Sequence, residues 1–223
     1  MPTVDLRRRV LEENERQAAR LREGFERSRT LVANLISSPG SGKTALLEAT
    51  ARALSGRLRM AVIEGDIATE RDADRLRALG IPAYQILTGG ACHLDARQVG
   101  RVVDARVLPD VELLFIENVG NLICPTSYDL GEDFKVALLS APEGDDKPFK
   151  YPATFAQADV TVITKADLLP HLRFDLDAVR AQVSTLCPGG VFLVTSAVTG
   201  EGLTAWIALL EDRLARKRAA STP

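Results

Sequence analysis

Residues 37–44 read S-S-P-G-S-G-K-T, and these residue types in this order are suited to binding phosphate. They follow the apolar run of residues 31–36 and precede a helical pattern, so a strand would end in a glycine turn that opens a helix. Such a turn aims backbone N–H groups and the positive helix end at one point. We expect Lys43 to reach the β- and γ-phosphates, and Thr44 to offer its hydroxyl to Mg²⁺. The nucleotide-contacting residues are predicted to be Gly40, Ser41, Gly42, Lys43, Thr44 and Ala45.

This loop departs from the usual pattern at its first position. The pattern G-x-x-x-x-G-K-[ST] begins with glycine, whereas Ser37 stands there in this chain. An ordinary Gly/Ser turn that caps a helix is the alternative interpretation. The strand before the loop and the helix after it favour phosphate binding.

Carboxylates follow two further apolar runs. Glu117-Asn118-Val119-Gly120 comes after residues 111–116, where a GTPase usually carries D-x-x-G, and Glu64-Gly65-Asp66 comes at the end of residues 60–64. We expect Asp66 and Glu117 to face Mg²⁺ and the N–H of Gly120 to meet the γ-phosphate. Lys43, Asp66 and Glu117 are therefore the predicted catalytic residues. Either acid, taken alone, could instead cap a helix.

Base recognition is predicted for two loops near the end of the chain. Thr164-Lys165-Ala166-Asp167 resembles the guanine-reading N-K-x-D motif, and Ser196-Ala197 resembles the S-A element after the last strand. An Asp carboxylate can accept hydrogen bonds from both guanine N1–H and the 2-amino group, a donor pair that adenine lacks. GTP is therefore favoured over ATP. Because Thr164 replaces Asn, the motif does not predict how this loop is braced against the phosphate loop.

Three side chains could hold a softer metal ion. Cys92 and His93 lie in a loop after the apolar run of residues 83–87, and Cys124 follows Gly120 by four residues. Thiolate and imidazole suit Ni²⁺ or Zn²⁺, and three ligands leave a fourth position for water or a second subunit. The alternative is a packed thiol beside a helix-start residue. Cys124 is tethered to the loop that would respond to the γ-phosphate, which favours the metal.

The elements that must position these residues alternate between strand and helix. Apolar runs at residues 31–36, 60–64, 83–87, 111–116, 136–139, 160–164 and 191–195 are mostly separated by helix-length segments. Continuously apolar strands are buried on both faces, so we predict an α/β fold with a mostly parallel central sheet flanked by helices. The predicted organisation is an N-terminal amphipathic helix within residues 1–29, one P-loop domain over residues 30–218 and a tail at 219–223. Helix 202–218 would bury Trp206.

Composition excludes several classes of protein. The chain has 223 residues, with 28 basic and 30 acidic side chains and a net charge of −2, which gives no general reason to expect a nucleic-acid or membrane partner. No apolar stretch approaches the ~20 residues of a membrane span, and the N-terminus lacks the apolar core of a signal peptide. We therefore expect a cytoplasmic protein. Its three cysteines do not indicate a disulfide framework.

A resemblance to a known family adds to this interpretation. Residues 37–44, 64–69, 88–95 and 117–125, together with Tyr128-Asp129-Leu130-Gly131 and Glu143-Gly144-Asp145-Asp146-Lys147-Pro148, resemble the hydrogenase-maturation nickel-insertion GTPases of the HypB family. The match runs from about residue 30 to about residue 205. It implies a dimerising P-loop GTPase that helps deliver Ni²⁺ to the large subunit of [NiFe]-hydrogenase, together with a small zinc- and nickel-binding maturation partner.

The resemblance also assigns roles. It implies that Cys92, His93 and Cys124 are the metal ligands, at a dimer interface promoted by nucleotide, with Ni²⁺ or Zn²⁺ bound. No residue is an obvious general base for the attacking water, so slow intrinsic hydrolysis of GTP to GDP is expected. Cys187 is predicted to be a packed thiol and His171 an exposed polar residue. Lys147 and Lys150 are interpreted as solvated lysines, with a phosphate or partner contact as the alternative.

Three other functions stay open at this point. A urease-type nickel GTPase usually carries C-P-H, whereas Cys92 and His93 are adjacent here. An ATP-dependent kinase of a small metabolite would share the phosphate loop and leave the cysteines merely packed. A metal-binding structural module would use nucleotide only for stability and would not turn it over.

Overall fold

A seven-stranded sheet forms the centre of the protein in the computed structural model, which describes residues 6–67 and 71–220. The strands run in the order β3-β2-β4-β1-β5-β6-β7, and every neighbouring pair is parallel. The predicted α/β fold with a parallel sheet is confirmed. The strands are β1 Leu31–Ser37, β2 Met60–Asp66, β3 Ala83–Leu87, β4 Leu113–Glu117, β5 Phe134–Ser140, β6 Val160–Thr164 and β7 Val191–Val194.

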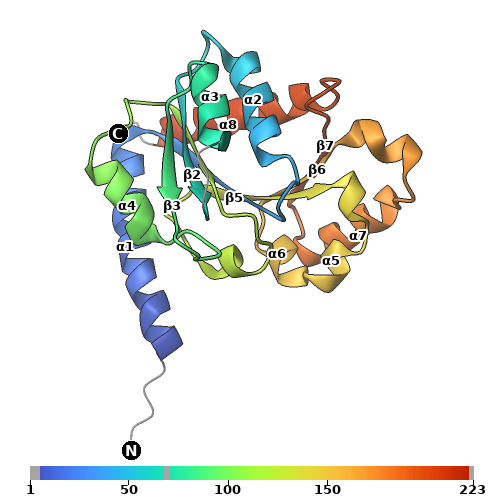
Figure 1. Ribbon diagram of the computed structural model, residues 1–223, viewed down its shortest axis with the longest axis horizontal. Helices are drawn as coiled ribbons and strands as arrows, with labels where there is room; N and C mark the ends of the chain where they lie inside the picture. Colours follow the sequence, from blue (N-terminus) through green and yellow to red (C-terminus); the bar gives the residue numbers. More distant parts are fainter. Residues whose placement is uncertain (1–5, 68–70, 221–223) are drawn as a thin grey trace, which may run out of the picture.

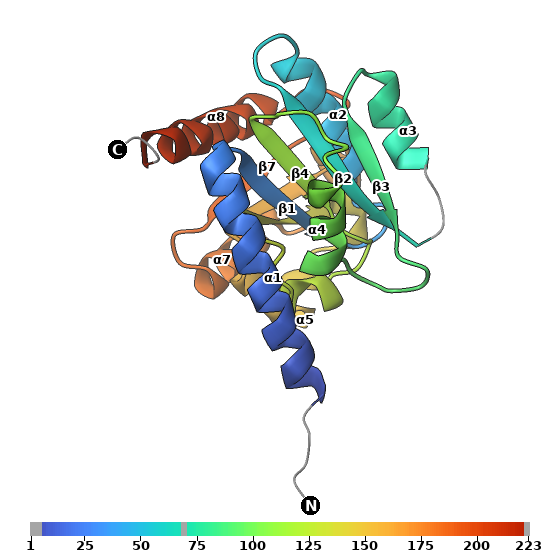
Figure 2. The same cartoon turned by 90° about the vertical axis from the view of Figure 1, so that its left-hand side faces the viewer.

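Helices cover both faces of this sheet (Figures 1 and 2). On one face, α2, α3 and α8 pack over the central strands. On the other face lie α1 and α4 at one end and α6 and α7 at the other. The helices are α1 Leu6–Ser28, α2 Lys43–Leu54, α3 Arg71–Ala78, α4 Ala96–Asp104, α5 Lys147–Lys150, α6 Pro152–Ala156, α7 Leu176–Leu186 and α8 Leu203–Ala220, and the 3₁₀ turns are η1 Cys124–Ser127, η2 Ala141–Glu143 and η3 Ala166–His171.

Burial differs between the inner and outer strands. Every residue of β1, β4 and β6 is buried, as are all of β2 except Asp66 and all of β5 except Lys135. The expectation of burial on both faces is wrong for β3 and β7, whose residues are half-buried or exposed. These two strands lie at the edges of the sheet, where each lacks a neighbour on one side. Compared with the predicted runs, β4 begins two residues later, β5 two residues earlier, and β7 ends one residue earlier.

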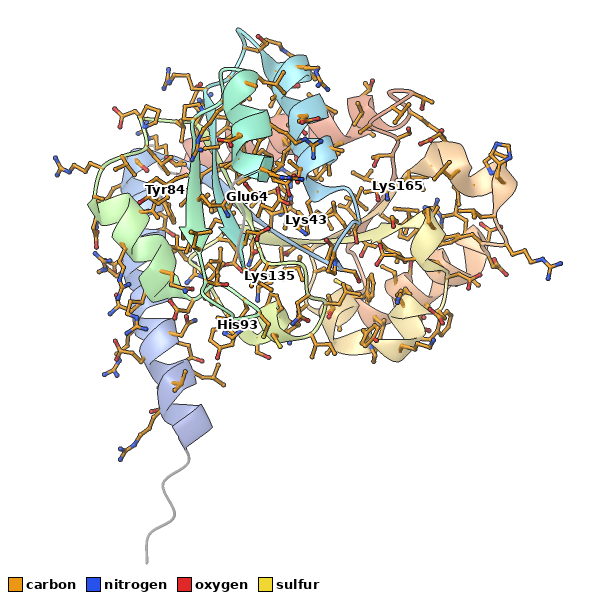
Figure 3. The ribbon with its side chains drawn as sticks, viewed as in Figure 1. Lys43, Glu64, Tyr84, His93, Lys135 and Lys165 are labelled. Atoms are coloured by element: carbon orange, nitrogen blue, oxygen red, sulfur yellow. The ribbon has the colours of Figure 1, made fainter. Side chains whose placement is uncertain are left out.

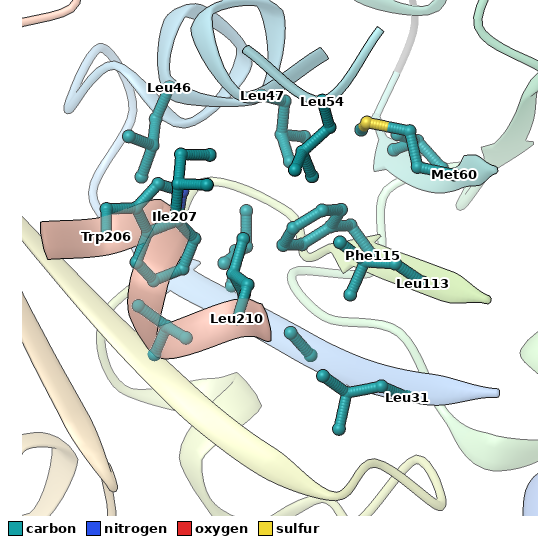
Figure 4. Packing of buried hydrophobic residues seen from close by; sticks show 14 of the residues in the cluster. Leu31, Leu46, Leu47, Leu54, Met60, Leu113, Phe115, Trp206, Ile207 and Leu210 are labelled. Atoms are coloured by element: carbon teal, nitrogen blue, oxygen red, sulfur yellow. The ribbon is translucent and has the colours of Figure 1, made fainter. Parts of the chain in front are cut away.

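The alternation of side chains along each inner strand builds the core. Phe115 faces α2 and α8, whereas Leu114 and Ile116 face α1 and α4. Trp206 of α8 is fully buried, as predicted, and lies near Phe115 with the ring centroids 6.4 Å apart (Figure 4). Its indole N–H donates to Thr50 Oγ1 at 2.8 Å, which satisfies the polar atom of an otherwise apolar side chain.

The helix α1 has an exposed beginning and a buried end (Figure 2). Val10 is exposed, whereas Ala18, Leu21 and Phe25 are buried against α4 and the sheet. The N-terminal helix is predicted within residues 1–29, of which residues 1–5 lie outside the described part of the chain, as do residues 221–223 of the predicted tail. The division at residues 29 and 218 stays a prediction. None of the described helices is long and apolar enough to cross a membrane.

Strand order decides where the predicted site can form. The strand β1 lies between β4 and β5, so the phosphate loop emerges from the middle of the sheet. Because all strands are parallel, the loops after β2, β4 and β6 leave from the same edge as the loop after β1. Segments that are far apart in sequence therefore meet at this edge.

We expect Thr50→Val to lower the free energy of unfolding by about 1–3 kcal/mol, because it leaves the buried Trp206 N–H without its acceptor. The measurement is denaturant unfolding followed by tryptophan fluorescence. Thr185→Val is a matched control, since both hydroxyls donate to the carbonyl four residues earlier but Thr185 is exposed. Equal losses in the two variants would contradict the role given to the indole contact.

Candidate nucleotide and metal site

The phosphate loop has the backbone that its sequence predicts. Gly40 and Gly42 have φ angles of 74° and 86°, in the left-handed region that favours glycine. The helix α2 begins at Lys43 directly after Gly42, and no side chain among the described residues caps its first turn. The N–H groups of that turn are therefore available to an anion.

Lys43 and Thr44 are held beside a buried carboxylate. Lys43 Nζ lies 3.0 Å from Ser37 Oγ, and Thr44 Oγ1 donates to Glu117 Oε1 at 3.1 Å. The second carboxylate oxygen, Glu117 Oε2, is buried and has no hydrogen-bond partner within residues 6–67 and 71–220. A buried oxygen of this kind fits the water shell of a divalent cation, which would relieve the cost of burying the charge.

Glu64 joins this group although the motif comparison did not assign it to the site. It lies two residues before Asp66 on β2 and is almost fully buried (Figure 3). Burial and the neighbouring Glu117 raise the pKa of Glu64 to about 9. Burial likewise raises the pKa of Glu117 to about 7, although Lys43 and Thr44 act in the opposite direction. The pocket thus gathers acidic side chains around one buried ammonium group, and burial keeps Glu64 in its protonated form at neutral pH.

These side chains surround a cavity of about 490 Å³ beside the phosphate loop. Asp72 and Arg75 of α3 extend its wall, and they are residues that motif reasoning missed. A pattern of charges on the helix that follows a phosphate-facing strand is the signal that could have identified them. The lining also includes Gly40, Gly42, Lys43, Thr44, Ala45, Glu64, Asp66, Glu117, Gly120 and Lys165.

The phosphate loop is braced from three sides. Thr164 Oγ1 donates to the carbonyl of Ser41 at 2.6 Å, and Lys165 Nζ donates to the carbonyl of Gly40 at 2.8 Å. Thr164 therefore makes a bracing contact that the sequence did not predict. Ser41 Oγ also lies 2.6 Å from Glu143 Oε2, in the loop after β5. Gly120 approaches so closely that a Cβ there would lie 2.9 Å from Pro39 Cγ.

The predicted base-reading residues come together beside this brace. Ser196 Oγ donates to Asp167 Oδ1 at 2.5 Å, and the N–H of Ala166 donates to the carbonyl of Thr195 at 3.0 Å. Lys165 takes a left-handed backbone conformation with φ 56°, so the chain turns sharply between Thr164 and Asp167. Asp167, Ser196 and Ala197 lie outside the lining of the 490 Å³ cavity.

The three predicted metal ligands converge. One ligand atom from each of Cys92, His93 and Cys124 lies within 4.8 Å of the other two, and Cys92 Sγ is 3.6 Å from His93 Nδ1. The side chains are half-buried. This spacing suits one ion bound by two sulfurs and one nitrogen, with a further position open to another ligand.

Neighbouring groups fix this triad and set its protonation. His93 stacks on Tyr128 with the ring centroids 3.9 Å apart, and Asn121 Oδ1 accepts from the N–H of Cys124 at 3.3 Å. Burial lowers the pKa of His93, which favours the neutral imidazole that binds metals. The hydrogen bond with Cys124 raises the pKa of Cys92, so an ion would have to displace a thiol proton.

Other residues that the sequence singled out lie away from these groups. Cys187 is half-buried after α7, where a Cβ on Gly190 would lie 3.0 Å from its sulfur. His171 is exposed at the end of η3. Lys150 pairs with Asp146, and Lys147 lies over the Tyr151 ring at 5.8 Å. Residues 68 and 69, which carried part of the family resemblance, lie outside the described residues.

The fold and the loop define a P-loop nucleotide-binding domain that carries a second, sulfur-containing site near the carboxyl edge of its sheet. Residues 31–193 match the model of the CobW/HypB/UreG nucleotide-binding domain. A hydrogenase maturation factor HypB of Azotobacter chroococcum is 50% identical over 97% of this chain and 71% of its own length, and that of Escherichia coli K12 is 49% identical over 92% and 70%.

A solved structure of a HypB protein has the same fold as this chain. The crystal structure of HypB from Helicobacter pylori in complex with nickel has a TM-score of 0.85 and 40% identity, and the alignment covers 95% of this chain and 98% of that one. The chain therefore belongs to the HypB family.

The buried carboxyl groups predict a pH dependence of stability. In the unfolded chain, Glu64 loses its proton as the pH rises through its ordinary pKa of 4.5. In the folded protein its pKa is about 9, so it stays protonated up to about that pH. Its contribution to the free energy of unfolding is thus greatest at low pH and falls as pH rises through this window, by at most about 1.4 kcal/mol per unit. In buffer without metal and nucleotide, Glu64→Gln should gain stability relative to the original protein between pH 6 and 8.5.

Denaturant unfolding at several pH values measures this difference, with the exposed Glu201→Gln as control. The free energy of unfolding of the control variant should change with pH in the same way as that of the unmodified protein. A stability gap that is constant with pH for Glu64→Gln would mean that Glu64 is already ionised in the fold.

Proposed function

We propose that this protein is a GTP-hydrolysing metallochaperone that assists nickel insertion into [NiFe]-hydrogenase. The observation that carries the proposal is the convergence of Cys92, His93 and Cys124 within 4.8 Å, with Cys124 on the loop that continues from Glu117 and Gly120 of the nucleotide site. Cys124 lies seven residues after Glu117, the buried carboxylate that contacts Thr44. A cargo ion and a hydrolysable nucleotide would thus act on one connected segment.

The nucleotide site can stabilise charge on a phosphoryl group. Lys43 would neutralise the β- and γ-phosphates, and the N–H groups of residues 40–45 would orient them. Mg²⁺, held by Thr44, Asp66 and Glu117, would supply further neutralisation of the phosphate oxygens. The orphaned Glu117 oxygen and the raised pKa values fit a cation at this position. We assign no general base, so hydrolysis to GDP would be slow without a partner or a second copy.

Guanine selection rests on Asp167. Its carboxylate already accepts a hydrogen bond from Ser196, which orients it, and it lies on the loop whose Lys165 braces the phosphate loop. An adenine base would leave this acceptor without the N1–H and 2-amino donors. Ala197 follows Ser196 and would contact the base through its backbone.

Nickel is the proposed cargo rather than a resident cofactor, with Zn²⁺ accepting the same ligands. Three ligands from one chain leave the coordination open, so a homodimer could complete it with a second set. GTP and metal would favour this dimer, and hydrolysis would relax it. The recipient would be the large subunit of [NiFe]-hydrogenase, reached together with a small nickel- and zinc-binding maturation protein.

Removing either thiol tests the cargo site. We expect Cys92→Ala and Cys124→Ala each to weaken Ni²⁺ binding by about 100-fold or more, since even groups that only support a ligand contribute 10–100-fold. Cys187→Ala is the matched control, because this third cysteine lies outside the triad. The measurement is a nickel titration with GDP or a non-hydrolysable GTP analogue, with mass followed by light scattering.

Two results would separate the alternatives in this titration. If metal affinity and dimer population both change with the nucleotide, and both triad variants lose the metal, the metallochaperone function is supported. If Ni²⁺ binds no better to the original protein than to the variants, the chain is a P-loop nucleotide-binding protein with a different substrate.

Base selection can be tested independently of the metal. Asp167→Asn exchanges an acceptor for a donor, so we expect GDP affinity to fall by on the order of 10²–10⁴-fold and xanthosine diphosphate, which offers a carbonyl instead of the 2-amino group, to bind better. Calorimetry with GDP, xanthosine diphosphate and ADP measures this, with the exposed Asp177→Asn of α7 as control. Preference of the unmodified protein for ADP would instead indicate an ATP-dependent kinase.

A further inference from the structure

Leu94 contacts the residues next to Asp66 and Glu117, two acidic side chains of the nucleotide site. It directly follows His93 and is fully buried. Its N–H donates to Asn118 Oδ1 at 3.0 Å, and its side chain packs so tightly on Gly65 that a Cβ there would lie 2.7 Å from Leu94 Cγ. Asn118 is the residue after Glu117, and Gly65 is the residue before Asp66. We call residues 88–95, which carry Cys92 and His93, the metal loop. Leu94 of this loop is thus held by the chain neighbours of Asp66 and Glu117, the two carboxylates proposed to face Mg²⁺.

The orientation of the Asn118 amide is fixed by its hydrogen-bond partners. It is 1% exposed, and Oδ1 also accepts from the N–H of Val119 at 3.0 Å. Asn118 Nδ2 donates to Asn34 Oδ1 at 3.3 Å, and Asn34 Nδ2 in turn donates to Glu132 Oε1 at 3.2 Å. Turning the Asn118 amide over would place its NH₂ group against the Leu94 N–H, so its orientation is determined by its partners. Such a buried, satisfied network has one well-defined arrangement.

Nucleotide binding would change the partners of the adjacent residue. In the structure, Glu117 Oε1 accepts from Thr44 and lies 3.9 Å from Lys43 Nζ. Lys43 and Thr44 are the groups that the phosphates and Mg²⁺ require. Glu117 must therefore exchange contacts between the free and the bound state, and Asn118 shares its peptide bond. The backbone N–H of Asn118 also donates to Leu35 of β1 at 3.0 Å, two residues before the phosphate loop begins.

We propose that Asn118 is a positioning residue that couples the nucleotide site to the metal site by setting the place of Leu94, and thereby of His93 and Cys92. The inference rests on the proposed function and adds the residue through which it acts. A coupling of this kind is a free energy between two sites, typically 5–150-fold in affinity, and it is reciprocal. It is expressed as the ratio of the Ni²⁺ dissociation constants measured with GDP and with a non-hydrolysable GTP analogue.

The chain supplies a matched control in Asn14 of α1. Its Oδ1 accepts from the N–H of Ala96 at 2.8 Å, and its Nδ2 donates to the carbonyl of Asp129 at 2.7 Å. Asn14 is buried, as Asn118 is, and holds the chain two residues after Leu94, at the first residue of α4. It does so from α1, which contributes nothing to the lining of the 490 Å³ cavity. Its loss should loosen the metal loop without breaking the connection to Glu117.

The experiment compares Asn118→Ala, Asn118→Asp and Asn14→Ala with the unmodified protein at one fixed protein concentration. We expect Asn118→Ala to bring the ratio of Ni²⁺ affinities to within about twofold of one. Asn118→Asp retains an oxygen that can accept from the Leu94 N–H and should keep most of the coupling. Asn14→Ala should weaken Ni²⁺ binding with both nucleotides by the same factor and leave the ratio unchanged.

Folding of each variant is verified by its affinity for GDP. If Asn118→Ala does not bind GDP, Asn118→Ser replaces it, because the serine hydroxyl is one atom too short to reach the Leu94 N–H. If Asn118→Ala, or Asn118→Ser in its place, binds GDP and Ni²⁺ but keeps the original ratio, the inference is overturned, and so it is if Asn14→Ala loses the coupling to the same extent. If the unmodified protein binds Ni²⁺ equally well with both nucleotides, the proposed control of the metal site by nucleotide is itself wrong. This outcome differs from a failure of the role given to Asn118 alone.

Discussion

Glu117 is buried at the end of β4, with one carboxylate oxygen facing Thr44 and Lys43 and the other without a hydrogen-bond partner among the described residues. Glu64 is buried beside it on the neighbouring strand β2, and burial together with the nearby Glu117 makes ionisation of Glu64 less favourable. Such a concentration of acid is costly in a protein interior unless cations arrive. The phosphate loop and the loop after β4 both border this pair of acidic side chains.

Much of this arrangement could be predicted from the sequence, because the signals are local. Seven apolar runs marked seven strands, and the order of Lys43 and Thr44 after β1 marked the phosphate loop. Cys92 and Cys124 are far apart in the chain, and family resemblance, rather than spacing, indicated that they meet. The edge positions of β3 and β7 could not be predicted, because an apolar run of five residues does not reveal how many neighbours the strand has.

Each contact that the sequence did not reveal has its own physical reason. Glu64 lies inside a strand pattern, where a carboxylate looks like an interruption of an apolar run rather than part of a site. Thr164 performs by a hydroxyl the bracing expected of an asparagine amide, and a motif records residue identity rather than the bond made. Asn118 and Asn14 act through the N–H groups of Leu94 and Ala96, and contacts between side chain and backbone leave no pattern in sequence.

The distance in sequence between Cys92 and Cys124 has a consequence for biogenesis. The loop with Cys92 follows β3 and the loop with Cys124 follows β4, and these two strands are brought together by β2, which lies between them and pairs with both. A nascent chain therefore cannot assemble the thiol–imidazole triad from local contacts alone, and strand pairing between distant segments is a slow step in folding. Capture of an ion by all three ligands would then require that β3, β2 and β4 have paired. An ion that binds the native state better than the separate thiols of an unfolded chain would also stabilise the folded protein.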